Sequence, residues 1–230
     1  MKKRLTLIQM DVHVNDVEYN YNRVQELLTQ SLSENPDIIV LPETWNTGFH
    51  PSDDLITIAD TNGARTKALL STFAKEHNVN IVGGSVAVAK DNLVFNTSYV
   101  YNRNGELVGE YSKMHGFSPA KEDKYFASGT HTTHFELDGI PCSTVICYDI
   151  RFPELVRMAA LPGTELLFVP AQWPTMRLRH WQVLNPWGTN LLEMDTNEGI
   201  ASVDIDLTVV EDIRKKINIF RDRKPELYNL

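Results

Sequence analysis

The sequence has few cysteines, and this scarcity bears on where the protein works. Only two cysteines, Cys142 and Cys147, occur among the 230 residues. On a single extended strand their Cα atoms would lie about 16 Å apart, whereas a disulfide bond requires less than about 7 Å. We therefore expect two free thiols, which suits a reducing compartment and favours a cytoplasmic protein.

Long apolar runs and an excess of positive charge are also lacking. No run approaches the roughly 20 apolar residues of a membrane span. The apolar residues 5–10 that follow the basic start are too few for a signal peptide. Acidic residues number 30 against 22 basic ones, which gives a formal net charge of −8. We therefore expect neither nucleic acid nor a membrane as the main partner.

What the sequence does contain is an alternation of strand and helix patterns. Hydrophobic residues make up 42% of the chain, which is enough for a sizeable core. Apolar runs predict strands at residues 4–10, 37–41, 80–87, 93–101, 106–111, 143–146, 165–169 and 199–205. Helical spacing predicts helices from Asn15 or Asp16, at residues 64–76, from Pro153 and at residues 207–217. Without repeats or a linker, this pattern predicts one α/β domain over residues 1–230 with a large mixed sheet.

Three reactive side chains each follow an apolar strand pattern. Glu43 comes after I-I-V-L-P, Lys113 after E-L-V-G-E-Y-S and Cys147 after S-T-V-I. In open α/β sheets, functional loops gather beyond the strand ends because the sheet anchors them rigidly. The sequence therefore predicts that these three side chains converge on one pocket.

Together these groups would support attack on an acyl carbon. A thiolate at Cys147 is a strong nucleophile, and the Lys113 ammonium or the dipole of the helix from Pro153 would lower its pKa. Glu43 would take the thiol proton and later activate water. Lys113 and the backbone N–H of Tyr148 would stabilise the oxyanion of a tetrahedral intermediate.

Each residue taken alone also has an ordinary structural interpretation. Cys142 and Cys147 would both be packed thiols, Glu43 a surface or capping carboxylate, and Lys113 a solvated charge. Residues 151–154 would be only a helix start with local ion pairs. The order and context of the surrounding motifs decide between these interpretations.

Six stretches of the sequence are similar to one known family. They are L-P-E-T at 41–44, Y-S-K-M-H at 111–115, I-C-Y-D-I-R-F-P-E at 146–154, Q-W-P at 172–174, H-W at 180–181 and the tail R-D-R-K-P-E-L-Y. Nearly end to end, the chain resembles the nitrilase superfamily of carbon–nitrogen hydrolases, and within it the omega-amidase-like branch. That branch hydrolyses small ω-amides of 2-oxo acids, such as 2-oxoglutaramate.

The resemblance implies a set of catalytic residues and a fold. It implies a Glu43–Lys113–Cys147 triad that releases ammonia from a small-molecule amide through a thioester, without a cofactor. Glu122, with Asp123 as its neighbour, matches a second glutamate that orients the lysine. The implied fold is an α-β-β-α sandwich with the sheets covered by helices, and the implied assembly is a homodimer.

Three further residues are expected to contact the substrate, and no metal site is expected. The substrate-binding candidates are Tyr148, Arg151 and Trp173. His131 and His134 have the spacing H-x-x-H. Two histidines three positions apart on a strand face opposite sides, so this pair does not predict a metal site.

The sequence departs from the family pattern in two places. Gly116 stands where family members commonly have leucine, in a loop that helps to shape the pocket. After Leu184 the sequence runs directly into Asn185, where the family continues with a helix and two strands. About 30 to 40 residues are absent, which is about the size of a βαβ unit. Losing two core strands would expose strand edges, so we expect the natural polypeptide to contain this segment between 184 and 185.

Two other functions remain open from the sequence. One is a cysteine hydrolase that uses His115 or His180 as the base, which the spacing does not favour. The other is a protein that keeps the nitrilase fold without turnover and serves as a binding or scaffolding module. Rapid alkylation of Cys147 and ammonia release from amides would separate the amidase from this last alternative.

Overall fold

The computed structural model describes residues 1–49, 51–172, 182–217 and 219–228. Its larger sheet has eight strands and a mixture of parallel and antiparallel pairs. In spatial order they are β13 (Gly199–Asp206), β1 (Lys2–Gln9), β2 (Ile38–Val40), β4 (Asn80–Val82), β6 (Leu93–Tyr101), β5 (Val86–Lys90) and β3 (Asp60–Thr61), with β7 (Leu107–Ser112) paired to β6. The first and last strands of the chain are therefore neighbours, since β1 pairs with β13.

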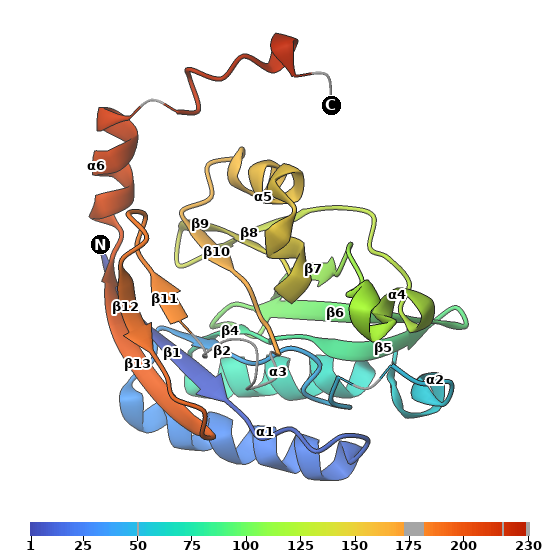
Figure 1. Cartoon of the computed structure of the whole chain (residues 1–230). Helices are drawn as coiled ribbons and strands as arrows, with labels where there is room; N and C mark the ends of the chain where they lie inside the picture. The colour runs from blue at the N-terminus through green and yellow to red at the C-terminus, as the bar shows by residue number, and fades with distance from the viewer. Residues whose placement is uncertain (50, 173–181, 218, 229–230) are drawn as a thin grey trace.

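Two long helices, α1 (Val17–Ser31) and α3 (Ala64–His77), cover one face of this sheet (Figure 1). The side chain of Asp16 caps α1 by accepting a hydrogen bond from the backbone N–H of Tyr19 at 3.1 Å. Tyr21, Val24 and Leu28 are buried at helical spacing against the sheet. The predicted start and buried face of this helix are therefore confirmed.

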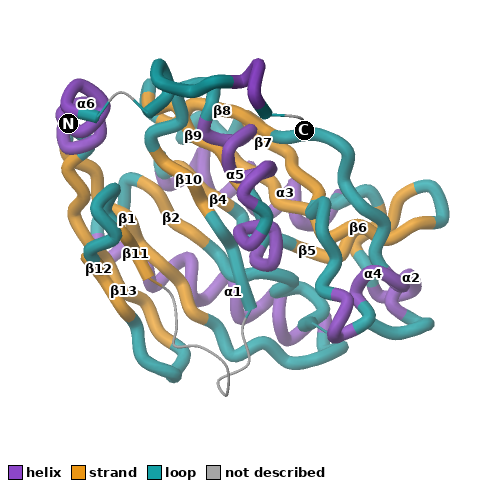
Figure 2. Tube along the Cα trace, turned by 45° about the horizontal axis from the view of Figure 1, so that its top comes forward, coloured by secondary structure: helices purple, strands orange, loops and turns teal. Residues whose placement is uncertain are grey.

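A second, three-stranded sheet packs on the opposite face of the first. Its order is β10 (Leu166–Phe168), β9 (Ile140–Thr144) and β8 (Thr133–Leu137). Side chains of both sheets share one apolar core, in which Cys142 is a packed thiol. Helix α5 (Pro153–Ala160) covers the outer face of this sheet, and Figure 2 shows it in front of the strands while α1 lies behind. The predicted α-β-β-α sandwich is confirmed.

The remaining elements are short. They are the helices α2 (Leu55–Ile58), α4 (Glu122–Tyr125) and α6 (Thr208–Lys216), and the 3₁₀ turns η1 (Leu32–Glu34), η2 (Ser118–Ala120), η3 (Cys147–Arg151) and η4 (Pro225–Leu227). Strands β11 (Gln182–Leu184) and β12 (Asn190–Glu193) form a hairpin around the N-P-W-G turn. In the described part of the chain, no helix is both long and apolar enough to cross a membrane.

The strand predicted at residues 80–87 is wrong in one respect, because it divides into β4 and β5. Gly84 between them has φ +62, and a Cβ there would lie 1.9 Å from the carbonyl oxygen of Pro42. Only glycine permits this approach. The next residue, Ser85, donates its backbone N–H to the same carbonyl at 3.0 Å. The break therefore holds the chain just before Glu43 against the end of β4.

A cluster of ion pairs ties the two sheets together at one end. Asp138, in the turn between β8 and β9, accepts hydrogen bonds from Arg103 Nε at 2.6 Å and from Lys3 Nζ at 2.6 Å. Lys3 belongs to β1, and Arg103 follows β6. Both cations thus come from the large sheet, while the carboxylate comes from the small one.

Candidate active site

Glu43 lies three residues beyond the end of a central strand, and its surroundings fix its backbone. The preceding residues Leu41 and Pro42 follow β2, and Thr44 has φ +44. A positive φ is uncommon outside glycine. Here Ser85 supports it, because its hydroxyl accepts the Thr44 N–H at 3.0 Å. At this bend Glu43 is buried, with the whole residue at 0% exposure.

Cys147 sits on a similarly bent backbone. Strand β9 ends at Thr144, and Cys147 opens η3 with φ +48. Its backbone N–H donates to the carbonyl of Pro170 at 2.9 Å, which holds this conformation. Sparsely populated backbone conformations cluster at functional sites because the surrounding structure must maintain them. The bend presents the thiol beyond the sheet instead of packing it within a strand.

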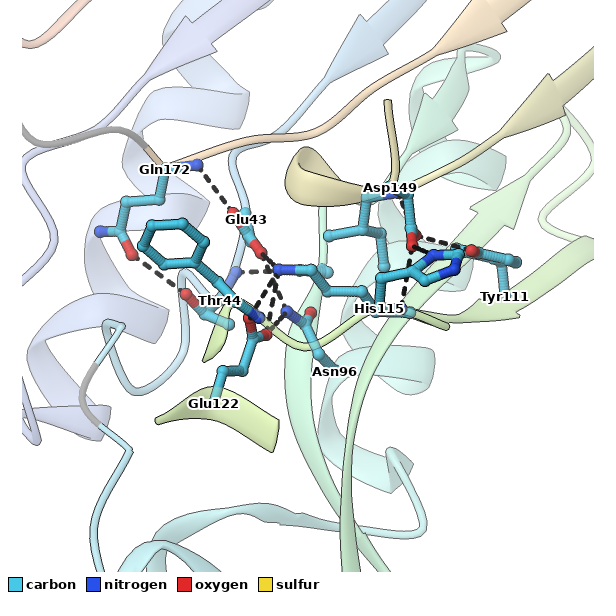
Figure 3. A network of polar contacts seen from close by, with 12 residues as sticks. Glu43, Thr44, Asn96, Tyr111, His115, Glu122, Asp149 and Gln172 are labelled. Carbon is cyan, nitrogen blue, oxygen red and sulfur yellow. Dashed lines mark hydrogen bonds and ion pairs between the residues drawn. The ribbon is translucent and has the colours of Figure 1, made fainter. Parts of the chain in front are cut away.

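Lys113 comes directly after β7 and brings the predicted acidic residues together. Its Nζ lies 2.8 Å from Glu43 Oε1, and 3.0 and 2.9 Å from the two oxygens of Glu122 (Figure 3). Glu122 is the first residue of α4 and is fully buried. It also accepts the backbone N–H of Phe117 at 2.7 Å. The structure therefore brings Lys113, Glu43 and Glu122 together in one buried cluster.

Two residues that the sequence reasoning missed complete this cluster. Asn96 of β6 donates its side-chain N–H groups to Glu43 Oε1 at 3.0 Å and to Glu122 Oε1 at 3.1 Å. The backbone N–H of Gln172 donates to Glu43 Oε2 at 2.9 Å. Gln172 belongs to the Q-W-P motif, whereas Asn96 lies in an ordinary strand pattern that gave no signal of a site.

Burial dominates the electrostatics of the cluster. Burial raises the pKa of the Cys147 thiol, Glu43 raises it further, and the charge of Lys113 only partly opposes them. Burial also acts against the Lys113 ammonium, but Glu43 and Glu122 outweigh it and raise the pKa of Lys113. The expectation that Lys113 lowers the pKa of Cys147 below its usual value is therefore wrong. The resting site holds a neutral thiol beside a charged lysine.

Glu122 has a pKa that is raised by burial and by the charge of Glu43, against the opposing effect of Lys113. Two carboxylates thus share a single ammonium in a buried place. Like charges this close disfavour each other's ionisation, so the hydrogen-bond donors around them matter for keeping both ionised.

A second buried network holds the turn that carries the thiol. Asp149 is fully buried and accepts hydrogen bonds from the Tyr111 hydroxyl at 2.7 Å and the Ile146 N–H at 3.1 Å. It also contacts His115, whose backbone N–H lies at 3.0 Å and whose ring Nδ1 lies at 2.8 Å (Figure 3). Asp149 therefore links η3 to β7 and to the loop after Lys113.

The same network bears on the histidine alternatives. His115 stacks on Phe152 with ring centroids 3.7 Å apart, and its Nδ1 contacts the carboxylate of Asp149. That ring nitrogen is thus engaged with Asp149. His180, like the substrate-binding candidate Trp173, lies outside the described residues.

The other two substrate-binding candidates lie on η3. Tyr148 is half-buried, and its ring packs edge-on against Phe117 at 5.1 Å. Arg151 is exposed at the end of the turn. Nearby, the family departure at Gly116 has a local reason, since a Cβ there would lie 2.8 Å from the backbone nitrogen of Asp123. Glycine lets this loop pack closely on α4.

Comparisons with known proteins identify the family. The family model described as "Carbon-nitrogen hydrolase" matches residues 4–186. The chain belongs to the carbon–nitrogen hydrolase family. The prediction from the sequence motifs is therefore confirmed, and this membership makes the protein a hydrolase of carbon–nitrogen bonds.

Relatives within this carbon–nitrogen hydrolase family carry more specific names. The chain is 34% identical over 261 residues to the 2-oxoglutaramate amidase of Bacillus subtilis, covering 99% of this chain and 100% of the relative. It is 27% identical over 267 residues to the omega-amidase of Homo sapiens, covering 98% and 96%. The resemblance to the omega-amidase-like branch is thus confirmed.

Solved structures agree with the fold. A carbon–nitrogen hydrolase superfamily protein of Xanthomonas campestris, whose active site carries an arsenic adduct, superposes with a TM-score of 0.85. It is 23% identical and covers 97% of this chain and 98% of its own. The nitrilase-type sandwich is therefore shared along nearly the whole chain.

Proposed function

We propose that this protein hydrolyses the terminal amide of a small 2-oxo acid ω-amide, such as 2-oxoglutaramate, and that Glu43, Lys113 and Cys147 form its catalytic triad. The observation that carries the proposal is the buried cluster in which Lys113 contacts Glu43 at 2.8 Å, with Cys147 electrostatically coupled to both. The similarity to a 2-oxoglutaramate amidase supports this substrate class.

The first half of the reaction forms a thioester. Glu43 takes the proton of the Cys147 thiol as sulfur attacks the amide carbon, so that the thiolate exists only during attack. The Lys113 ammonium and the backbone N–H of Tyr148 stabilise the oxyanion. When the carbon–nitrogen bond breaks, the amide nitrogen receives the proton from Glu43 and leaves as ammonia.

The second half of the reaction hydrolyses the thioester. Glu43, again unprotonated, takes a proton from water as the water oxygen attacks the thioester carbon. The second tetrahedral intermediate collapses by breaking its carbon–sulfur bond, and the proton returns to sulfur. The products are the carboxylic acid and the free enzyme. Glu122 holds Lys113 in place through both halves, and Tyr148, Arg151 and Trp173 are proposed to contact the substrate.

The proposed working form is a cytoplasmic homodimer that binds neither nucleic acid nor a membrane and uses no cofactor. Large apolar side chains on and beside α5 support a second copy as the partner, because Ile150 is 42%, Met158 52% and Leu161 40% exposed. Adjacent exposed apolar side chains commonly mark protein interaction sites. Light scattering of the purified protein would contradict this assembly if it gave the monomer mass at micromolar concentration.

The test of the function is ammonia release from a panel of ω-amides, other small amides and nitriles. We expect 2-oxoglutaramate to be among the best substrates. Cys147→Ala should remove the activity, while Cys142→Ala, which changes the other buried thiol, should retain it. Absence of ammonia release from every compound would instead favour the scaffolding module.

A further inference from the structure

Asn96 is joined to three of the four residues of the proposed catalytic cluster. It lies in β6, where it is 1% exposed. Its backbone carbonyl accepts the Lys113 N–H at 2.9 Å, so the backbone of Lys113 lies beside Asn96. Its side-chain nitrogen lies 3.0 Å from Glu43 Oε1 and 3.1 Å from Glu122 Oε1 (Figure 3).

The side-chain amide of Asn96 has a defined orientation. Its Nδ2 carries two N–H groups, and each is directed at a different glutamate. Its Oδ1 is buried and has no hydrogen-bond partner among the described residues. Reversing the amide would place that oxygen against both carboxylates, where acceptor faces acceptor. The two glutamates therefore hold the amide with its nitrogen inward, even though its oxygen is left unpaired.

The N–H groups of an amide are donors only, so the oxygens that they contact must act as acceptors. This favours the ionised form of Glu43 and Glu122 at those atoms. Asn96 does so without adding charge to a cluster in which two carboxylates already share the single ammonium of Lys113. Burial and the charge of Glu43 raise the pKa of Glu122, and a donor to this carboxylate opposes that effect.

The contacts also distinguish the two oxygens of Glu43. Oε1 accepts from both Lys113 and Asn96, which occupies its two lone-pair directions. Oε2 accepts the backbone N–H of Gln172 and keeps a lone pair for another donor. Without Asn96, Glu43 Oε1 would keep only the hydrogen bond from Lys113, and the difference between the two oxygens would be smaller.

We propose that Asn96 is a positioning residue of the hydrolysis, holding Glu43 and Glu122 ionised and directing Glu43 Oε2 to exchange the proton with Cys147. This inference rests on the proposed function, since it gives Glu43 the role of base. It assigns a role to a residue that lies in none of the recognised motifs. Asn96 acts through the carboxylates and is not assigned any contact with substrate.

The test follows the alkylation of Cys147 by iodoacetamide as a function of pH, located by peptide mass spectrometry, in the wild type and in Asn96→Ala. Loss of a hydrogen bond to a charged group should slow alkylation at neutral pH by about 10- to 100-fold. It should also move the acidic limb of the profile to higher pH, because carboxylates that lose a donor hold their proton more tightly. The same shift is expected in kcat/KM for ammonia release.

Asn80→Ala is the matched control. Asn80 is also a strand asparagine, 1% exposed, with a buried Oδ1 that lacks a partner in the described structure, and it donates to the Asp37 carbonyl at 2.9 Å, outside the cluster. In Asn80→Ala, the pH profile of Cys147 alkylation should keep the midpoint of the wild type. Alkylation of Cys147 should be slower in Asn96→Asp than in Asn96→Ala. Aspartate has nearly the same shape as asparagine but adds a third carboxyl group to the cluster.

Three results would overturn the inference. One is an unchanged rate and midpoint in Asn96→Ala. Another is an equal shift in Asn80→Ala, which would indicate a general effect of packing. The third is loss of the folded circular dichroism spectrum in Asn96→Ala, which would make Asn96 a residue of the fold alone. Alkylation does not require an amide substrate, so a wild type that releases no ammonia would contradict the proposed function and leave this test intact.

Discussion

Lys113 and Glu43 form an ion pair at 2.8 Å although 70 positions separate them in the sequence. Both side chains are almost wholly buried, with side-chain exposures of 2% and 1%. Removing two charges from water is costly, and a pair in such a place is seldom retained for stability alone. Glu122 adds a second carboxylate on the same ammonium. The cluster therefore places two carboxyl groups on one buried ammonium, an arrangement that suits proton transfer better than it suits folding.

The first prediction concerns the charge balance of this cluster. Lys113→Met leaves Glu43 and Glu122 without their ammonium, so the free energy of unfolding should fall by about 3–5 kcal/mol and ammonia release should be lost. In the double variant Lys113→Met with Glu122→Gln, part of the stability should return because one buried charge is gone. Activity should not return. Urea denaturation and ammonia assays measure the two effects separately.

The control for this series is Lys67→Met, since Lys67 pairs with Glu110 at 3.8 Å and is 35% exposed. A partly exposed pair contributes only about 0–1 kcal/mol, so this variant should unfold nearly as the wild type does. If Lys113→Met cost no more than Lys67→Met, the two glutamates could not both be ionised in the folded protein.

The second prediction separates the thiol pKa from reactivity. The charge of Glu43 is among the causes that raise the pKa of Cys147. In Glu43→Gln the pKa of Cys147 should therefore fall, yet ammonia release should fall too, by about 10²- to 10⁴-fold, because the general base is gone. Thiolate absorbance in a pH titration reports the first effect. The Cys142 thiol, whose pKa burial raises to about 12, provides an internal reference.

Two outcomes would contradict this prediction. If Glu43→Gln left the pKa of Cys147 where it was, or raised it, Glu43 would not face the thiol. If ammonia release survived, another group would be the base. Glu110→Gln, which removes a carboxylate outside the cluster, should change neither quantity.

The sequence was informative where chemistry follows a strand end. Glu43, Lys113 and Cys147 each stood out because an apolar run stops just before them, and the family motifs added Glu122. Helix boundaries were predictable at Asp16 and Pro153 for local reasons, a side-chain cap and a ring that suits the first helical turn.

Other features depended on the packed structure. Asn96 lies in a sequence pattern that is typical of any strand. Only the packing of β6 beside the ends of β2 and β7 shows what its side-chain amide contacts. The left-handed backbone of Thr44 and Cys147 is supported by distant partners, Ser85 and Pro170. The pKa of Cys147 was predicted in the wrong direction because the degree of burial, which outweighs Lys113, cannot be read from a motif.

The third prediction is a pH dependence of stability at Asp138. Hydrogen bonding to Arg103, first of all, and to Lys3 holds the pKa of this carboxyl well below its ordinary value. The stability that it contributes is present above the unfolded pKa of about 3.9 and is lost as pH falls through the lower folded value. Asp138→Asn should therefore cost about 1–3 kcal/mol at neutral pH, and the cost should shrink only below about pH 4.

Asparagine preserves the turn in this experiment, since Asp138 has φ +53 and asparagine tolerates that conformation. The control is Asp91→Asn, at another turn residue with φ +51 that is exposed. Its unfolding free energy should change little at any pH. A cost at Asp138 that stayed constant down to strongly acidic pH would show that the ion pairs are not its source.

The last prediction concerns the segment expected between residues 184 and 185. In the described structure β10 has a strand partner only on the side of β9, and its residues Leu166 and Leu167 are half-buried. The alignment to the Bacillus subtilis relative runs over 261 residues, longer than this chain of 230. Two additional strands would pair with the open edge of β10 and cover these side chains.

We therefore expect the protein isolated from its own cells to have an intact mass above the 26.2 kDa of this chain. The same material should unfold at higher denaturant concentration than the 230-residue chain, because additional apolar surface is buried against β10. An intact mass of 26.2 kDa would contradict the prediction. In that case a second chain would have to cover the edge of β10, and the stability of the protein should then increase with its concentration.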